Sequence, residues 1–162
     1  MLSEYVFMPK GTKELYYPKD FQWNATAPVY LVATAKNLGR WVHHFIKNAE
    51  NIFAETNDPN LHVIIFDYNS PDINLEEVLK RSSLTNYMLL RQSGAYSRTR
   101  SFTEAINLVK DPRSIIFMMD LHLDIASPFI NMIRKVSCLT SCYRVVLLSV
   151  VEPKPKYYSD QS

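Results

Sequence analysis

Glycine is scarce in this sequence: Gly11, Gly39 and Gly94 are the only three in a chain of 162 residues. The two common glycine-rich phosphate loops, G-x-G-x-x-G and G-x-x-x-x-G-K, are therefore absent. If the chain binds a nucleotide, its phosphates must be held in another way, by a metal ion or by cationic side chains.

Cysteine is equally scarce, since Cys138 and Cys142 are the only two. Their C-x3-C spacing has no companion pair, which argues against a structural zinc site. A disulfide between them is allowed in an oxidising compartment but is not implied by the spacing.

Long apolar runs and strong charge are also missing. No stretch of about 18 apolar residues encodes a membrane span, and the first residues lack the basic and apolar regions of a signal peptide. A formal net charge of +2 without a long Lys/Arg block gives no reason to expect nucleic acid as a partner. Asn24-Ala25-Thr26 is an N-glycosylation sequon, which matters only in a secretory context.

The chain does contain enough apolar material for a core, with 47% hydrophobic and 12% aromatic residues. Short apolar runs rich in β-formers alternate with segments of helical periodicity. This alternation predicts an α/β fold, a Rossmann-like and mostly parallel sheet with helical crossovers. We expect strands at 29–34, 61–66, 87–90 and 115–119, and helices within 38–53, 74–79, 102–111 and 128–136.

Three regions follow from this pattern. Residues 1–27 form an extended arm rich in aromatic side chains, and residues 28–136 carry the alternating elements. Residues 137–162 add one apolar run at 145–151, which allows a fifth strand, and then a polar tail.

The segment Asp120-Leu121-His122 directly follows the apolar run 115–119. In an extended segment, residues two apart project from the same side, so this carboxylate and imidazole should emerge together at the end of a strand. Open α/β sheets bind ligands at that edge, and the two groups suit a divalent metal that would hold a diphosphate. The alternative is a capping aspartate and a surface histidine in an ordinary loop.

His43 and His44 are a second histidine pair, within a predicted helix. Adjacent helical residues point about 100° apart, so the two imidazoles do not readily share one metal ion. A solvated helix face is the better interpretation.

The loops together resemble a known family. Asp67-Tyr68-Asn69-Ser70-Pro71-Asp72, Gly94-Ala95-Tyr96-Ser97-Arg98, Leu108-Val109-Lys110-Asp111-Pro112 and Asp120-Leu121-His122 occur in the order found in chondroitin N-acetylgalactosaminyltransferases. The likeness is greatest to their β1,4-N-acetylgalactosaminyltransferase branch and runs from about Val29 to Val136. It implies the donor half of a GT-A glycosyltransferase, which transfers GalNAc from UDP-GalNAc to a terminal GlcNAc or glycosaminoglycan-type acceptor in the Golgi.

The resemblance also implies roles for particular residues. Asp120 and His122 match the family's metal motif and would hold Mn²⁺ against the UDP diphosphate. Asp67 matches a position that contacts uracil or ribose, with an ordinary loop cap as the alternative. Thr34 and Lys36 would border the nucleotide.

Arg98 matches an arginine that approaches the nucleotide-sugar. For Arg98 and its neighbour Arg100, the alternative is a solvated helix N-terminus. The residues that follow, 99–104, are bulkier than the glycine-containing segment usual in the family, which puts close approach of a diphosphate in doubt.

The resemblance ends before the family's acceptor half. The Trp-Gly-Gly-Glu-Asp-like segment with the catalytic base has no counterpart here, nor has the distal metal-binding histidine, so the catalytic residues are unknown. We expect a chain that binds UDP with Mn²⁺ but does not transfer sugar alone, as a truncated or spliced product or an incomplete gene model. Family members are membrane-anchored in the Golgi, and a lumenal location would expose Asn24 to glycosylation.

Two other interpretations stay open at this point. The chain could be a non-catalytic binding or interaction remnant of such an enzyme. An unrelated flavodoxin-like or response-regulator-like domain also fits the alternation, although the paired acidic residues of that class are missing after the first strand.

Overall fold

The computed structural model describes residues 24–139 and 145–147, and of residues 136–139 and 145–147 it describes the backbone alone. These residues form five strands and four helices in the order β1-α1-β2-α2-β3-α3-β4-α4-β5. The strands are β1 (Val29–Ala35), β2 (Leu61–Asp67), β3 (Tyr87–Arg91), β4 (Ile115–Met118) and β5 (Val145–Leu147). The helices are α1 (Gly39–Thr56), α2 (Leu75–Arg81), α3 (Arg98–Leu108) and α4 (Pro128–Leu139).

The strands form one sheet in the order β3-β2-β1-β4-β5, and every neighbouring pair is parallel. The expected α/β fold with a parallel sheet is confirmed. β1 lies in the middle, where Val32 is opposite Ile64 of β2 on one side and Met118 of β4 on the other. The chain builds outward from β1 to β3 and then returns to the other side of β1, so the strand order reverses between β1 and β4.

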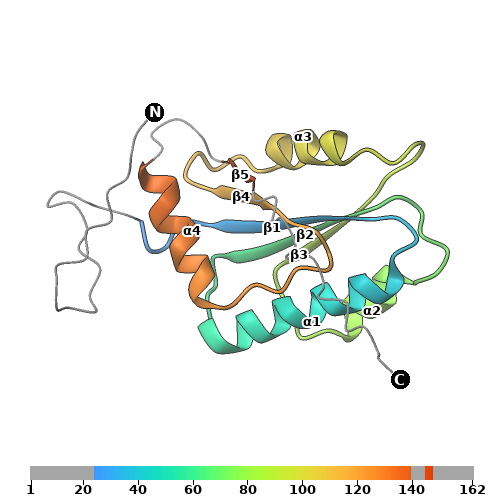
Figure 1. Ribbon diagram of the computed structural model, residues 1–162, viewed down its shortest axis with the longest axis horizontal. Coiled ribbons are helices and arrows are strands. Elements are labelled where there is room, and N and C mark those ends of the chain that lie inside the picture. Colours follow the sequence, from blue (N-terminus) through green and yellow to red (C-terminus); the bar gives the residue numbers. More distant parts are fainter. Residues whose placement is uncertain (1–23, 140–144, 148–162) are drawn as a thin grey trace, which may run out of the picture.

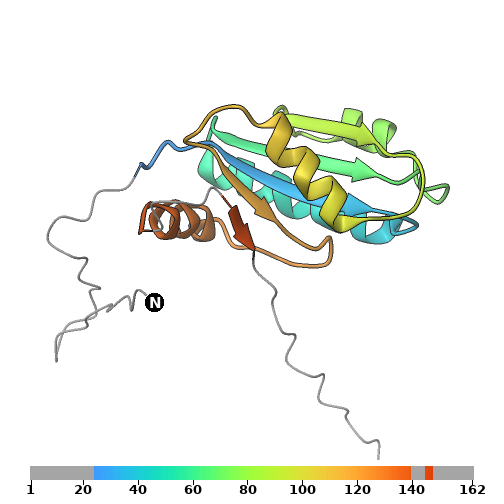
Figure 2. The same ribbon diagram turned by 90° about the horizontal axis from the view of Figure 1, so that it is seen from above.

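The helices cover the two faces of the sheet unequally. α1, α2 and α4 lie on one face, and α3 lies alone on the other (Figure 1). Seen from above, α3 crosses the strands diagonally (Figure 2). The inner strands β1, β2 and β4 are almost wholly buried, as strands of a parallel sheet usually are, whereas β3 at the edge is partly exposed.

Side chains alternate between the two faces along each strand. On β1, Leu31 and Ala33 belong to the larger core under α1, α2 and α4, whereas Val32 belongs to the smaller core under α3. On β4, Phe117 and Met118 divide in the same way. The expected strand at 115–119 therefore has the predicted burial, although β4 itself ends at Met118.

The predicted helix starts are only partly confirmed, since α3 begins at Arg98 and not at 102. The Asn74 side chain accepts a hydrogen bond from the Glu77 amide (3.3 Å), as a helix cap should. α4 begins at Pro128 as expected, and the hydroxyl of the preceding Ser127 donates to the Glu55 carboxylate of α1. Most of the N-terminal arm (1–23), Cys142 and the polar tail fall outside the described residues.

A buried ion pair joins three segments on the α4 side. Arg134, which is 4% exposed, donates from Nε to the Ala27 carbonyl (2.9 Å) and places Nη2 2.6 Å from the Asp58 carboxylate. The pair links α4 to the residue before β1 and to the turn before β2. Removing one member of such a pair leaves a buried charge without compensation.

We therefore expect Asp58→Asn to destabilise the fold by roughly 3 kcal/mol, because the Arg134 guanidinium loses its counter-charge. Denaturant unfolding of the purified chain measures this. Arg113→Gln is the matched control, since the Arg113–Asp111 pair is on the surface and its loss should leave the unfolding midpoint unchanged. Equal effects of the two variants would contradict the structural importance of the buried pair.

Glu50 of α1 ties this helix to the turn after α2. Its Oε1 accepts hydrogen bonds from the Ser83 amide (2.7 Å) and hydroxyl (3.1 Å). The Ser83 amide bond is the main cause that lowers the pKa of Glu50 below its ordinary value, and Lys47 lowers it further.

A lowered carboxyl pKa stabilises the fold above the unfolded-state value, and this contribution is lost as the pH falls through the folded-state value. We expect the stability of the wild type to decline below about pH 4.5, where an unfolded glutamate begins to protonate. In Glu50→Gln, the decline should be shallower. Parallel stability curves for the two proteins between pH 3 and 6 would contradict this role of Glu50.

Candidate functional site

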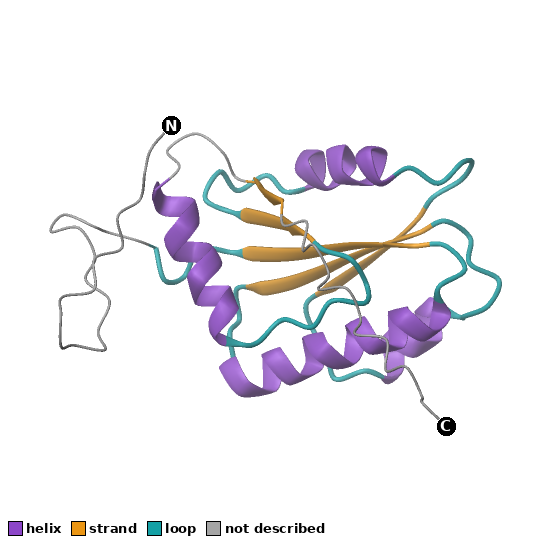
Figure 3. Cartoon of the chain, in the orientation of Figure 1, coloured by secondary structure: helices purple, strands orange, loops and turns teal. Residues whose placement is uncertain are grey.

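The loops that follow the first four strands meet at one edge of the sheet. Because β1 to β4 are parallel, their carboxyl ends point in the same direction, and the loops after them (Figure 3) gather there. The reversal of strand order between β1 and β4 occurs at this edge. Such a reversal opens a crevice, which is the usual ligand site in open α/β sheets.

A pocket of about 640 Å³ lies at this edge over β1, β2 and β3. Its volume is within the range of small-molecule sites. It is lined by loop residues that follow the three strands, together with the last residue of β3: Lys36, Asn37, Tyr68, Asn69, Pro71, Arg91, Gln92, Ser93 and Gly94. Of the predicted nucleotide-binding residues, Lys36 lines this pocket.

Thr34 and two tyrosines fasten the start of α3 to the sheet edge. The Thr34 hydroxyl shares a hydrogen bond with the Tyr96 hydroxyl (2.8 Å), and the Tyr96 ring meets the edge of the Tyr68 ring at 5.2 Å between centroids. Tyr68 donates to the Ser97 carbonyl (2.7 Å) and shares a hydrogen bond with the Ser101 hydroxyl (2.8 Å). Thr34 is thus buried beside the edge, with its hydroxyl engaged by protein.

Asp67 is at the end of β2 but does not line the pocket. It is 6% exposed, and its Oδ1 accepts a hydrogen bond from the Ser70 amide (2.9 Å). Ser70 in turn accepts through Oγ from the Asn37 amide (3.2 Å), so Asp67 supports two of the loops that form the edge. These contacts are those of an ordinary loop-capping aspartate, the alternative to the contact with uracil or ribose that the resemblance implies.

The N-terminus of α1 opens on the same edge but is already capped. Leu38 offers no side-chain cap, and the Gly39 amide donates instead to the Asp72 carboxylate (2.7 Å) from the loop after β2. A Cβ on Gly39 would lie 3.1 Å from that carboxylate oxygen, so a glycine permits the approach. The positive end of this helix is therefore neutralised by protein and is not presented to a phosphate.

Asp120 meets Arg98 on the β4 side of the edge. Oδ1 of Asp120 lies 2.9 Å from Nη1 of Arg98, the first residue of α3, and both side chains are about two-fifths exposed (43% and 42%). The segment after β4 is not extended, since the Leu123 amide donates to the Asp120 carbonyl (3.1 Å) and closes a turn. The argument that Asp120 and His122 project together as strand residues is therefore wrong, because the strand ends two residues before Asp120.

His122 lies beside the first turn of α1. Its ring meets the Trp41 ring at 5.8 Å, and Trp41 also meets His44 at 5.6 Å, both in edge geometry. The Arg40 guanidinium lies 5.6 Å from the Trp41 ring. Asp120 and His122 thus belong to the same turn but have different neighbours.

This turn fits a divalent metal in part. Carboxylate and imidazole are suitable ligands for Mn²⁺, and both side chains reach solvent. Within 24–139 and 145–147, no group of three or more histidine, cysteine, aspartate or glutamate side chains could hold an ion. Protein could therefore supply Asp120 and His122, and the other ligands would be water or a bound diphosphate.

α1 holds the loop after β4 in place. Asn48 donates to the Ile125 carbonyl (3.1 Å) and accepts from the Ile125 amide (3.2 Å). One turn earlier, Nε2 of His44 lies 3.1 Å from Oδ1 of Asp124. These contacts fix the loop that carries Asp120 and His122.

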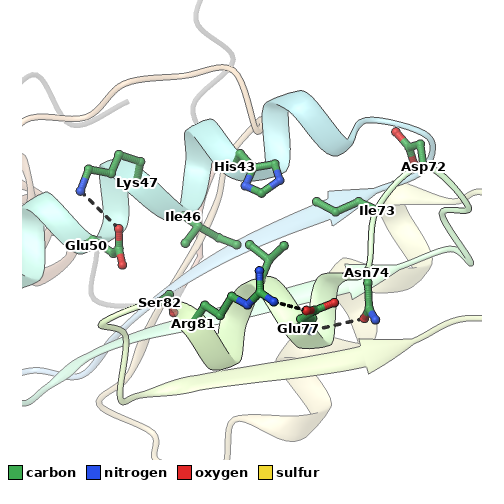
Figure 4. A pocket seen from close by; sticks show the side chains of 11 residues that line it. His43, Ile46, Lys47, Glu50, Asp72, Ile73, Asn74, Glu77, Arg81 and Ser82 are labelled. Atoms are coloured by element: carbon green, nitrogen blue, oxygen red, sulfur yellow. Dashed lines mark hydrogen bonds and ion pairs between the residues drawn. The ribbon is translucent and has the colours of Figure 1, made fainter.

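A second pocket, of about 550 Å³, lies between α1 and α2 (Figure 4). His43 lines it, whereas His44 faces Asp124, so the two adjacent histidines do diverge. Its charged side chains are paired with one another, as Lys47 is with Glu50 and Arg81 with Glu77. The groove presents no convergent set of unmatched groups and is the weaker candidate.

Several residues of the edge receive no site role from the sequence alone, although Tyr68, Gly94 and Tyr96 belong to the loop motifs of the family resemblance. Asn37, Tyr68, Gln92 and Gly94 border the first pocket, and Tyr96 anchors α3. A sequence signal existed for Gly94, whose backbone φ of 90° is a conformation that glycine adopts readily. Asn24, the sequon residue, is exposed, and its side-chain oxygen accepts from the Thr26 amide (3.0 Å).

Comparison with known proteins finds similarity both in sequence and in fold. The chain is 29% identical to mouse N-acetyl-beta-glucosaminyl-glycoprotein 4-beta-N-acetylgalactosaminyltransferase 1 over 127 residues, 78% of this chain and 12% of that protein. The chain thus spans a small fraction of that relative's length. No protein-family model matches.

Among solved structures, the fold is similar to that of mannosyltransferase PcManGT from Pyrobaculum calidifontis in complex with GDP-Man and Mn²⁺. The TM-score is 0.55 at 16% identity, over 78% of this chain and 36% of that chain. This likeness confirms the expected GT-A type of fold. The sequence similarity and the fold similarity are both to glycosyltransferases, and the chondroitin N-acetylgalactosaminyltransferase branch stays a prediction.

No helix within the described part of the chain is both long and apolar enough to cross a membrane.

The Asn48 contacts predict a local effect of mutation. We expect Asn48→Ala to destabilise the fold by about 1 kcal/mol, because the Ile125 peptide loses both hydrogen bonds. Amide hydrogen exchange should accelerate more at residues 121–125 than in β1 and β2, where it follows only the change in global stability. Asn51→Ala, at an exposed position of the same helix, controls for helix propensity. Unchanged exchange in the loop would show that Asn48 does not hold it.

Proposed function

We propose that residues 28–136 bind the nucleotide-sugar donor of a glycosyltransferase, together with a divalent metal ion. The observation that carries this proposal is the pairing of Asp120 with Arg98 at the same carboxyl edge of the sheet as the pocket, although neither residue lines that pocket. A carboxylate that suits a metal and a guanidinium that suits a phosphate lie where such folds bind ligands. The sequence similarity to an N-acetylgalactosaminyltransferase supports the class of reaction.

The nucleoside would occupy the pocket over β1, β2 and β3. Amide side chains such as Asn37 and Asn69 line it and could read the polar edge of a base. Tyr68 is 3% exposed and offers little ring surface for stacking. Thr34 and Asp67 would act by holding the loops, since both are buried and bonded to protein.

The diphosphate would lie toward β4, between Lys36 and Arg98. The capped N-terminus of α1 is not available to it, and the sequence has no glycine-rich loop. Cationic side chains and the metal must therefore balance its charge. Asp120 and His122 would hold Mn²⁺, which would stabilise the negative charge on the departing UDP.

The similarity to the mouse enzyme supports UDP-GalNAc as the donor and a terminal GlcNAc as the acceptor. On the same basis we propose a Golgi lumenal location, where Asn24 would be open to glycosylation. Within 24–139 and 145–147 we assign no catalytic base, so the described part of the chain would supply donor binding.

Calorimetry of UDP binding with and without Mn²⁺ tests the proposal. We expect Mn²⁺-dependent binding by the wild type that weakens at least tenfold, or about 1.4 kcal/mol, in Asp120→Asn and His122→Ala. His43→Ala is the matched control, because this exposed histidine lines the other pocket. UDP, GDP and ADP are compared to test the choice of base.

Two results would contradict the proposed binding of a nucleotide-sugar and a metal ion. Folded wild-type protein that binds no nucleotide in the presence of Mn²⁺ would leave the fold without this function, as a non-catalytic remnant. An equal loss of Mn²⁺-dependent UDP binding in His43→Ala would show that the metal does not bind specifically at Asp120 and His122.

A further inference from the structure

Asp120 is already engaged in the protein without ligands. Its Oδ1 lies 2.9 Å from Nη1 of Arg98, so the carboxylate assigned to the metal is paired with the cation assigned to the diphosphate. A divalent cation and a guanidinium compete for the same carboxylate oxygens. The two assigned roles therefore depend on one another.

Arg98 lies at the N-terminus of α3, where a positive charge is unfavourable unless an acidic group compensates it. Arg98 and Arg100 occupy the first turn of α3, which has no acidic residue, although the positive end of a helix disfavours cations. Asp120 compensates Arg98, and the Arg100 guanidinium donates to the Ser93 carbonyl (3.4 Å). When Asp120 is withdrawn from Arg98, this end of α3 is left with uncompensated positive charge.

We propose that Asp120 exchanges partners during ligand binding, and that this exchange couples the metal to the diphosphate. In the free protein Asp120 pairs with Arg98. When Asp120 binds a divalent cation, Arg98 is released and turns to the diphosphate. This inference rests on the proposed donor-binding function and adds to it a role for Arg98 as a competitor of the metal.

Because the Arg98–Asp120 pair is partly exposed, breaking it should cost little free energy. Both side chains are about two-fifths exposed, and surface ion pairs of this kind stabilise proteins only slightly. Competition by Arg98 should therefore weaken metal binding roughly two- to fivefold. Linkage requires the converse effect as well: metal bound at Asp120 should strengthen diphosphate binding by freeing Arg98.

The test measures the two ligands separately on the full chain. Binding of Mn²⁺ alone is followed by electron paramagnetic resonance of the free ion, and binding of UDP at saturating Mn²⁺ is followed by calorimetry. In Arg98→Gln we expect Mn²⁺ alone to bind roughly two- to fivefold tighter and UDP to bind at least tenfold weaker. A merely structural role of Arg98 would weaken both.

Arg100→Gln is the matched control, since it removes the same charge from the same helical turn without touching Asp120. It should leave Mn²⁺ binding unchanged, and this separates direct competition from a general change in charge. Arg98→Lys, which keeps the cation, should bind Mn²⁺ more like the wild type than Arg98→Gln does. Far-UV circular dichroism confirms that each variant is folded.

The outcomes separate this inference from the proposed function. Wild-type binding of Mn²⁺ and UDP together with unchanged or weaker Mn²⁺ binding in Arg98→Gln would overturn the exchange and leave the function standing. Tighter Mn²⁺ binding in both Arg98→Gln and Arg100→Gln would also overturn it. No binding of either ligand by the wild type would refute both proposals.

Discussion

The central position of β1 is the constraint on which the rest of this structure depends. β1 is hydrogen-bonded along both sides, to β2 and to β4, and most of its side chains are fully buried. Because all the pairings are parallel, the loops after β1, β2, β3 and β4 end at one edge. The reversal of strand order at β1 then places the loop after β1, whose Lys36 and Asn37 line the pocket, between the loops after β2 and β4. The site is thus a consequence of sheet topology more than of any one loop.

Charge at this edge is distributed unevenly between two helix N-termini. The start of α1 is neutralised by the Asp72 carboxylate, whereas the start of α3 carries Arg98 and Arg100. A phosphate therefore gains little at α1 and more at α3, where side-chain cations add to the helix dipole. This arrangement fits a chain without a glycine-rich phosphate loop. It also explains why the Arg98–Asp120 pair lies at the point where metal and phosphate chemistry would meet.

The loop after β4 and the start of α3 are each held by several contacts, and the exposed Arg98–Asp120 ion pair joins them. Asn48 and His44 of α1 hold the loop after β4 through Ile125 and Asp124, and Tyr68 and Tyr96 hold the start of α3. In the proposed exchange, the exposed Arg98–Asp120 pair between these two segments is the contact that changes partners, because surface ion pairs stabilise a fold only slightly. Loops held in place on both sides of this pair would suit the coupled binding of two ligands.

The sequence alone determined the element types, because burial on both faces makes β1, β2 and β4 continuous apolar runs and amphipathic helices separate them. It also indicated that Asp120, His122 and Arg98 follow strands at the ligand edge. Only the tertiary structure decided which of these groups touch. Asp67 proved to be buried and bonded to Ser70, and Asp120 lies in a turn that alternation along a strand cannot describe. Contacts such as Asp120 with Arg98 join residues 22 positions apart. They depend on how α3 crosses the sheet, which local periodicity does not encode.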